Sequence, residues 1–153
     1  MKAFTIIEIL IVMAIIGVLI GFGFANLNFG SRNDLNLSVN EIVAALRNAQ
    51  SNSMTQEKGS EWSVHFENPP SNKGFYEIYK ESIYSSANVV SHINLRETVK
   101  FDDPSSGSSK NISFSVLSGF PSGSGSDVII ISLKNNPSET KTINIKANGQ
   151  IEY

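Results

Sequence analysis

Residues 1–25 of the chain read MKAFTIIEILIVMAIIGVLIGFGFA, and this stretch decides the fold. A short leader is followed by an apolar run that begins at Phe4 and contains one carboxylate, Glu8. No charged side chain occurs over residues 9–25, so the run reaches the ~20 residues that a helix needs to cross a bilayer. An unpaired charge inside such a helix costs at least ~2.5 kcal/mol, so Glu8 should have a partner and a role.

Three interpretations of this segment compete. A cleaved secretory signal has a basic region, an apolar core of about 7–15 residues and a small-residue cleavage site. Here the run is longer, the basic region is Lys2 alone, and no such site follows. A plain signal anchor explains the length of the run and leaves Glu8 unexplained. The third interpretation rests on a resemblance.

The string AFTIIEILIV over residues 3–12 resembles the class III signal of type IV pilins and type II secretion pseudopilins. The resemblance implies that a prepilin peptidase cuts between Ala3 and Phe4, that the new Phe4 amine is N-methylated, and that Glu8 is the fifth mature residue. It also implies that Glu8 faces the Phe4 amine of a neighbouring subunit in a fibre. Breaking a buried pair of this kind leaves an uncompensated charge, so the pair would select the axial stagger of the subunits.

Composition bounds the remainder of the chain. The protein has 153 residues, a formal net charge of −2 and no cysteine. Roughly 120 residues follow the apolar stem, which is enough for one domain of ordinary size. The absence of cysteine removes disulfides, thiolate metal ligands and thiol nucleophiles. Lys and Arg are scattered singly, so the basic patch of a general nucleic-acid binder is missing.

An amphipathic pattern continues the helix beyond the apolar run. Apolar residues recur at three- and four-residue steps, while polar residues fill the other faces, which predicts one buried stripe. The stripe consists of Leu35, Val39, Ile42, Leu46 and Ala49. We therefore expect one helix over about residues 5–56, loosened near residues 28–33 and ending near residues 57–59.

From residue 61 onward the hydrophobic period switches to two. Short alternating runs separated by Pro, Gly, Asn and Ser predict antiparallel strands with one buried face, packed on the helix stripe. The runs cover residues 62–66, 75–79, 89–95, 99–101, 112–116, 128–133, 143–145 and 151–153. Residues 102–110 and 118–127 are rich in Ser and Gly and are expected to be exposed, mobile loops. The predicted fold class is α+β and type IV pilin-like: a long N-terminal helix, transmembrane in its first half and amphipathic in its second, packed on a C-terminal antiparallel β-sheet domain.

A narrower resemblance covers most of the chain. The segment NEIVAALRNAQS over residues 40–51 is similar to the stem of the GspH/FimT family of minor pseudopilins and minor pilins, although Gln50 and Ser53 replace the usual Arg and Ala. The order of the later strands also follows that family. Some members bind DNA through basic residues near the C-terminus. Residues 144–153 of this chain hold a single Lys and end in Glu-Tyr, so the sequence does not favour nucleic acid as a partner.

Other candidate chemistry is weak. His65 and His92 are far apart in the sequence and are interpreted as ordinary strand residues rather than ligands. The glycine-rich residues 119–125 lack the Lys and the following helix of a phosphate-binding loop. Asp102 and Asp103, or the loop over residues 125–127, could donate oxygens to Ca²⁺, but they lack the spacing of an EF-hand, so a solvated turn is favoured. We expect no catalytic, cofactor-binding or metal-ligating residue.

The sequence thus predicts a structural subunit and not an enzyme: a minor pilin or pseudopilin of a type IV pilus or type II secretion system. The expected divisions are a leader at 1–3, a transmembrane and assembly helix at 4–28, and an amphipathic helix with a β-sheet domain at 29–153. Ala3 and Phe4 are the processing residues and Glu8 is the assembly residue. The expected partners are other pilin or pseudopilin subunits, prepilin peptidase and inner-membrane lipid.

The expected location is the inner membrane, with one transmembrane pass and the globular domain outside the cytoplasm, and a pilus or pseudopilus after assembly. Two alternatives stay open. The chain could be a major pilin, or a membrane-anchored pilin that binds a ligand in DNA uptake or adhesion.

Overall fold

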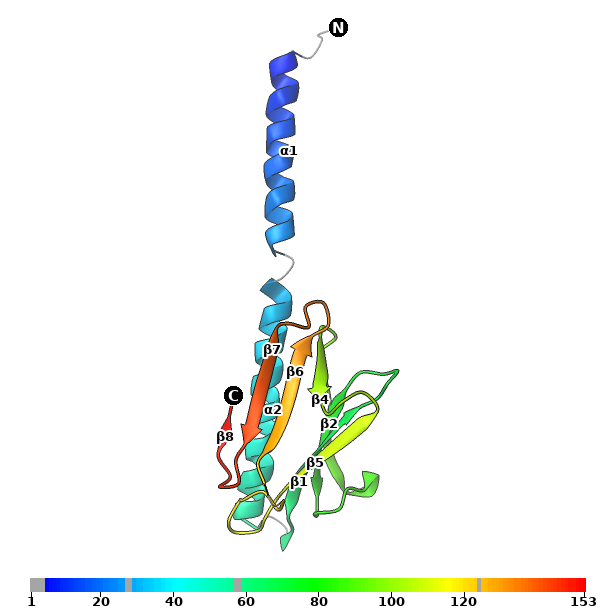
Figure 1. The fold of residues 1–153 in the computed structure, drawn as a ribbon, viewed down its shortest axis with the longest axis vertical. Helices are drawn as coiled ribbons and strands as arrows, with labels where there is room; N and C mark the ends of the chain where they lie inside the picture. Colours follow the sequence, from blue (N-terminus) through cyan, green and yellow to red (C-terminus); the bar gives the residue numbers. More distant parts are fainter. Residues whose placement is uncertain (1–4, 27–28, 57–58, 124) are drawn as a thin grey trace.

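The computed structural model describes residues 5–26, 29–56, 59–123 and 125–153, and two helices set its long axis (Figure 1). Helix α1 covers Ile6–Asn26 and helix α2 covers Phe29–Met54. α1 extends away from the rest of the chain, and its large apolar side chains over residues 6–20 are exposed. Over the described part of the chain, no helix is long and apolar enough to cross a membrane.

One face of α2 forms the centre of the globular part. The predicted stripe is confirmed, because each of its members is buried: Leu35, Val39, Ile42, Leu46 and Ala49. The opposite face carries Asn40, Arg47 and Asn48, which are exposed. A helix with one buried stripe is stabilised mainly by what packs on that stripe.

Two antiparallel sheets of four strands each pack against α2. The first sheet has the order β3-β2-β1-β5, and the second has the order β4-β6-β7-β8. The strands of the first sheet are β1 (Trp62–Asn68), β2 (Phe75–Lys80), β3 (Val89–Asn94) and β5 (Ser108–Phe114). Those of the second are β4 (Val99–Asp103), β6 (Asp127–Leu133), β7 (Thr140–Ile145) and β8 (Ile151–Glu152). A short 3₁₀ turn, η2 (Ser86–Asn88), precedes β3.

Side chains along β1 point alternately to the two faces of the first sheet. Trp62, Val64 and Phe66 are buried in the core that includes the α2 stripe. Successive strand side chains point to opposite faces, so His65 and Glu67 lie on the outer face. The outer face is the one that carries the polar groups described below.

The end of α2 is tied to the start of β1. Ser53 is fully buried, and its Oγ accepts a hydrogen bond from the Trp62 backbone N–H (2.8 Å) and donates to the Trp62 carbonyl (3.4 Å). The usual Ala of the GspH/FimT pattern could make neither bond. Ser53 therefore couples the helix to the central strand of the first sheet.

Three details differ from the sequence prediction. α2 ends at Met54, before the expected residues 57–59, because Gln56 adopts a positive φ of 53°, a left-handed conformation that stops a helix. The expected loop at 102–110 is largely strand, since β4 continues to Asp103 and β5 begins at Ser108. Polar residues stay in these strands because they pair with one another: Lys110 Nζ lies 2.5 Å from Asp103 Oδ2. The strands also divide into two sheets, a division that the sequence did not indicate.

Candidate functional site

The predicted assembly residue lies at the start of α1. Glu8 is exposed and occupies the first turn of the helix, three residues after Thr5. The Glu8 N–H lies 3.4 Å from Thr5 Oγ1, and the Thr5 N–H lies 3.5 Å from Glu8 Oε2. This reciprocal arrangement is a capping box, and the Thr-x-x-Glu spacing could have predicted it. The predicted processing residues, Ala3 and Phe4, lie outside the described residues.

Beside Glu8, one face of α1 exposes apolar side chains. Glu8, Ile9, Val12 and Met13 line a shallow, open depression on this face, and the part of Glu8 that lines it is apolar. These residues follow the i, i+4 spacing of one helix face. Both bonds of the capping box are long for hydrogen bonds, so the carboxylate stays available to a further partner beside an apolar surface.

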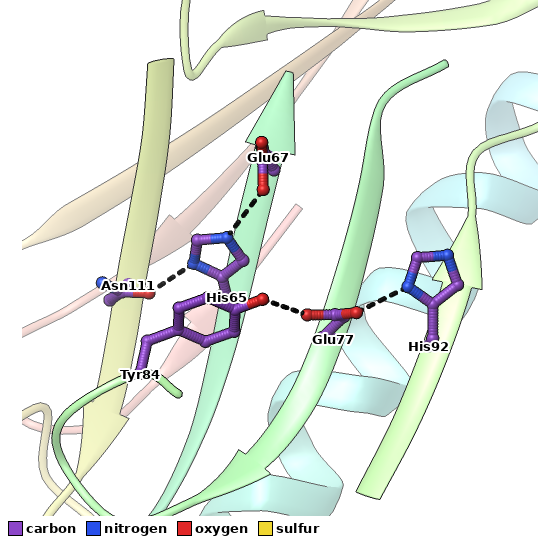
Figure 2. A network of polar contacts seen from close by, with 6 residues as sticks. All are labelled: His65, Glu67, Glu77, Tyr84, His92 and Asn111. Carbon is purple, nitrogen blue, oxygen red and sulfur yellow. Dashed lines mark hydrogen bonds and ion pairs between the residues drawn. The ribbon is translucent and has the colours of Figure 1, made fainter. Parts of the chain in front are cut away.

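A second cluster of polar groups lies on the outer face of the first sheet (Figure 2). The strand register places Asn111 opposite His65, His65 opposite Glu77, and Glu77 opposite His92. These four residues, from β5, β1, β2 and β3, form one row across the sheet. We call this row, with Glu67 and Tyr84, the histidine cluster.

Every polar side chain in the histidine cluster has a partner within it. His65 is only 4% exposed; its Nδ1 lies 2.6 Å from Asn111 Oδ1, its Nε2 lies 3.3 Å from Glu67 Oε2, and the Tyr84 ring stacks on its ring at 3.8 Å. Glu77 Oε1 lies 2.6 Å from His92 Nδ1, and Glu77 Oε2 accepts a hydrogen bond from the Tyr84 hydroxyl (2.6 Å). The cluster therefore fastens the β2–β3 connection, which carries Tyr84, onto the sheet.

The electrostatics of the cluster agree with this role. Burial raises the pKa of Glu77, but hydrogen bonds from Tyr84 and His92 and the charges of the two histidines outweigh burial and hold that pKa below its usual value. The hydrogen bond to Glu77, together with burial, raises the pKa of Tyr84 to about 12. The site thus favours an ionised Glu77 and a neutral Tyr84.

The lowered pKa of Glu77 predicts a pH-dependent stability. A carboxylate with a lowered folded-state pKa stabilises the fold above its unfolded pKa, and the contribution is lost as pH falls through the folded pKa. Glu77→Gln should therefore melt below wild type at about pH 7, and the difference should shrink at about pH 3.5. Thermal unfolding followed by the fluorescence of Trp62, the one tryptophan, measures this. The matched control is Glu152→Gln, which removes a half-exposed carboxylate and should leave the melting temperature nearly unchanged at both pH values.

His65 and His92, expected from the sequence to be ordinary strand residues, are linked in the structure through Tyr84 and Glu77. Glu77 and Tyr84 carried no signal in the sequence, because the register of three strands brings Glu77 to the histidines and the course of the β2–β3 connection brings Tyr84 to them. Over the described residues, no group of three or more His, Cys, Asp or Glu side chains could hold a metal ion. The side chains of the two histidines and Glu77 make their contacts within this group and with Tyr84 and Asn111.

Asp102 and Asp103 are also paired. Asp102 Oδ1 lies 2.8 Å from Lys100 Nζ, and Asp103 pairs with Lys110. Burial raises the pKa of Asp102, but the hydrogen bond and the positive charge of Lys100 favour the ionised carboxylate, and the pKa lies below its usual value. Each carboxylate is thus balanced by its own lysine, an arrangement typical of a surface ion pair rather than a Ca²⁺ site.

Comparison with solved structures finds this fold in the type IV minor pilin FimU of Pseudomonas aeruginosa strain PAO1. One crystal form superposes with a TM-score of 0.56 at 16% identity and covers 81% of this chain and 90% of that chain. A second crystal form gives a TM-score of 0.55 at 15% identity and covers 77% of this chain and 90% of that chain. No protein-family model and no curated protein matches the sequence. The likeness establishes the fold: a type IV pilin-like long N-terminal helix packed on an antiparallel β-sheet domain.

Proposed function

We propose that the protein is a structural subunit of a fibre, a minor pilin or pseudopilin that assembles through α1. The observation that carries the proposal is the combination of a pilin-like globular part with a protruding helix whose large apolar side chains are exposed over residues 6–20. An isolated apolar helix is unfavourable in water, because each buried apolar side chain gains about 1.5–3 kcal/mol relative to an exposed one. α1 therefore needs lipid or other helices around it.

The prepilin-like string at residues 3–12 supports the same function. In the proposed pathway, residues 1–3 are removed as a leader, residues 4–28 anchor the chain in the inner membrane, and residues 29–153 fold outside the cytoplasm. The anchor then leaves the lipid and packs among the α1 helices of neighbouring subunits in a type IV pilus or a type II secretion pseudopilus. The chain is a minor pilin if it assembles with the subunits of a type IV pilus, and a pseudopilin if it assembles with those of a type II secretion system.

Among the residues that the structure describes, the polar surfaces give no support to an enzyme or a nucleic-acid binder. Each polar side chain of the histidine cluster contacts another member of the cluster, and Lys146, the basic residue nearest the C-terminus, lies 2.5 Å from Glu152. Phosphate binding depends on clustered Lys and Arg that are free to meet the backbone. A structural role therefore remains the function with the best physical support.

Processing provides the direct test of the proposed function. Coexpression of the full chain with a prepilin peptidase should remove Met1, Lys2 and Ala3 and leave an N-methylated Phe4 at the N-terminus. Intact-mass analysis of the membrane fraction measures both changes. A chain produced without the peptidase should keep residues 1–3 and serves as the control. A chain that keeps its leader in the presence of the peptidase, or that is cut beyond residue 25, contradicts the proposal.

A further inference from the structure

The connection between β2 and β3 lies against the outer face of the first sheet. It consists of residues 81–88, and most of its side chains are exposed, Ile83 most of all. Tyr84 instead turns toward the sheet. Its ring stacks on the His65 ring at 3.8 Å (Figure 2) and meets the Tyr79 ring edge-on at 5.3 Å. We call residues 81–88 the strap.

The strap covers side chains that are buried although they lie on the outer face. Ser63 is opposite Tyr79 in the strand register, and His65 follows two residues later on β1, so all three share that face. Ser63 and Tyr79 are fully buried, and His65 nearly so. The Ser63 hydroxyl also donates to the Glu81 carbonyl (2.8 Å) at the start of the strap. The burial of this face therefore depends on the position of the strap.

One carboxylate, that of Glu77, holds Tyr84 on the sheet. Glu77 Oε2 accepts from the Tyr84 hydroxyl, and Glu77 Oε1 faces His92 Nδ1, both at 2.6 Å. An ionised carboxylate accepts at both oxygens, whereas a protonated carboxyl group carries a hydrogen on one of them. Hydrogen bonds to an ionised acceptor are also roughly twice as strong as those between neutral groups. Protonation of Glu77 therefore weakens the attachment of Tyr84.

The charges around Glu77 make its ionisation important to the whole cluster. The titratable groups near Glu77 and Tyr84 are His65 and Glu67 on β1, Tyr79 on β2 and His92 on β3. Burial raises the pKa of Glu77, but the hydrogen bonds and the positive charges of both histidines hold that pKa below its usual value. Without the Glu77 charge, the buried His65 keeps only Glu67 as a counter-charge, at 3.3 Å. A buried charge that loses a partner is destabilising.

One group beneath the closed strap has no partner. The Tyr79 hydroxyl is buried and makes no hydrogen bond within the described part of the chain. A buried hydroxyl without a partner is costly, and contact with water would remove that cost. Closure of the strap is thus stabilised at Glu77 and opposed at Tyr79, so weakening the Glu77 contacts shifts the balance toward an open strap.

We propose that the strap opens in acid: it lies closed while Glu77 is ionised, and protonation of Glu77 releases Tyr84 and exposes Tyr79 and His65 to solvent. The core on the other face of the sheet stays folded, because its buried side chains include no member of the histidine cluster. The outer face would then present a different surface in acid than at neutral pH. This inference uses only contacts within the globular part and is independent of the proposed function.

Hydroxyl-radical footprinting of the full chain in detergent tests the proposal, because peptide mass spectrometry reads Tyr79 and Trp62 separately. Tyr79 lies beneath the strap, and Trp62 is buried in the core on the opposite face. Between about pH 7 and about pH 3, oxidation of Tyr79 should rise roughly tenfold, the least effect expected from losing a hydrogen bond to a charged group. The midpoint should lie below about pH 4.3, the usual pKa of a glutamate. Trp62 should stay protected throughout.

Two variants identify the carboxylate that controls the strap. Glu77→Gln is neutral at every pH, so its Tyr79 should be oxidised at about pH 7 as strongly as that of wild type at about pH 3, with no further rise in acid. The matched control is Glu81→Gln, which removes a carboxylate of the strap itself that accepts from the Asn88 amide (2.9 Å). Glu81→Gln should keep the wild-type dependence of Tyr79 oxidation on pH.

A third variant covers the case in which Glu77→Gln unfolds. Tyr84→Phe keeps the ring that stacks on His65 and removes only the hydroxyl, so it should raise Tyr79 oxidation at about pH 7 and reduce its further rise in acid. Trp62 should remain protected in this variant.

Three results would overturn the proposal. If Tyr79 and Trp62 of the wild-type chain become oxidised together, acid unfolds the whole globular part rather than the strap. If Tyr79 stays protected down to about pH 3, the strap does not depend on an ionised Glu77. If Glu81→Gln abolishes the transition while Tyr84→Phe leaves it unchanged, the controlling carboxylate is Glu81.

Discussion

Leu46→Ala should lower the free energy of unfolding of the globular part by ~2–5 kcal/mol. Leu46 is 0% exposed and belongs to the core in which α2 meets both sheets. Truncation to Ala removes buried methyl groups and leaves a cavity, since close-packed neighbours relax only in part. Urea denaturation of the detergent-solubilised chain, followed by Trp62 fluorescence, measures the loss, because Trp62 is buried in the same core.

The matched control is Leu37→Ala on the same helix. Leu37 is 39% exposed and lies off the buried stripe, so its truncation should cost less than ~0.5 kcal/mol. Both variants make the same chemical change in the same helix, so the difference between them reports burial rather than helix propensity. A loss below ~0.5 kcal/mol for Leu46→Ala would place that face of α2 in solvent and contradict the packing of the sheets on the stripe.

Glu8→Val should be inserted and processed like wild type yet enter fibres at least ~10-fold less efficiently, a loss of about 1.4 kcal/mol or more. An apolar side chain is less costly in lipid than a carboxylate, so insertion should not suffer. In the proposed fibre, however, the Phe4 amine of a neighbouring subunit would lose its counter-charge on burial. The measurement is the fraction of processed chain recovered in sheared fibres relative to wild type.

The capping box supplies a sharper control for Glu8. Glu8→Gln keeps a side-chain oxygen that can accept from the Thr5 N–H and removes only the charge, whereas Thr5→Ala removes the cap and keeps the charge. If charge pairing drives assembly, Glu8→Gln should fail like Glu8→Val while Thr5→Ala should assemble. The opposite pattern would assign Glu8 to the helix cap alone. Equal recovery of all variants would remove Glu8 from assembly altogether.

Much of the fold was predictable because the spacing of hydrophobic residues along the chain depends only on the helix or strand that contains them. The stripe from Leu35 to Ala49 and the alternation of Trp62, Val64 and Phe66 each follow from the geometry of one element. The division into two sheets depends instead on which strands pair, which the alternation within a strand does not specify. The early end of α2 depends on a single left-handed residue, Gln56, whose type does not require that conformation.

The site was predictable only in part for the same reason. Glu8 was conspicuous because a carboxylate in an apolar run is anomalous by itself. Its role in assembly, like processing at Ala3 and Phe4, remains a prediction. The histidine cluster was missed because His65, Glu77 and His92 become neighbours only through the register of β1, β2 and β3. The exposure of Leu117 and Phe120 was missed because it depends on the course of a loop, which neither the helical nor the strand period describes.

The bond between Ser53 and Trp62 has a mechanical consequence. A pull on α2 reaches β1 through the Ser53–Trp62 bond as well as through the buried stripe, and β1 lies between β2 and β5 rather than at an edge. Tension therefore loads two antiparallel ladders along their length, and many hydrogen bonds share it at once. A strand at an edge would instead detach one bond at a time. A protein built in this way should resist extension along its stem more strongly than the same sheet pulled from β3.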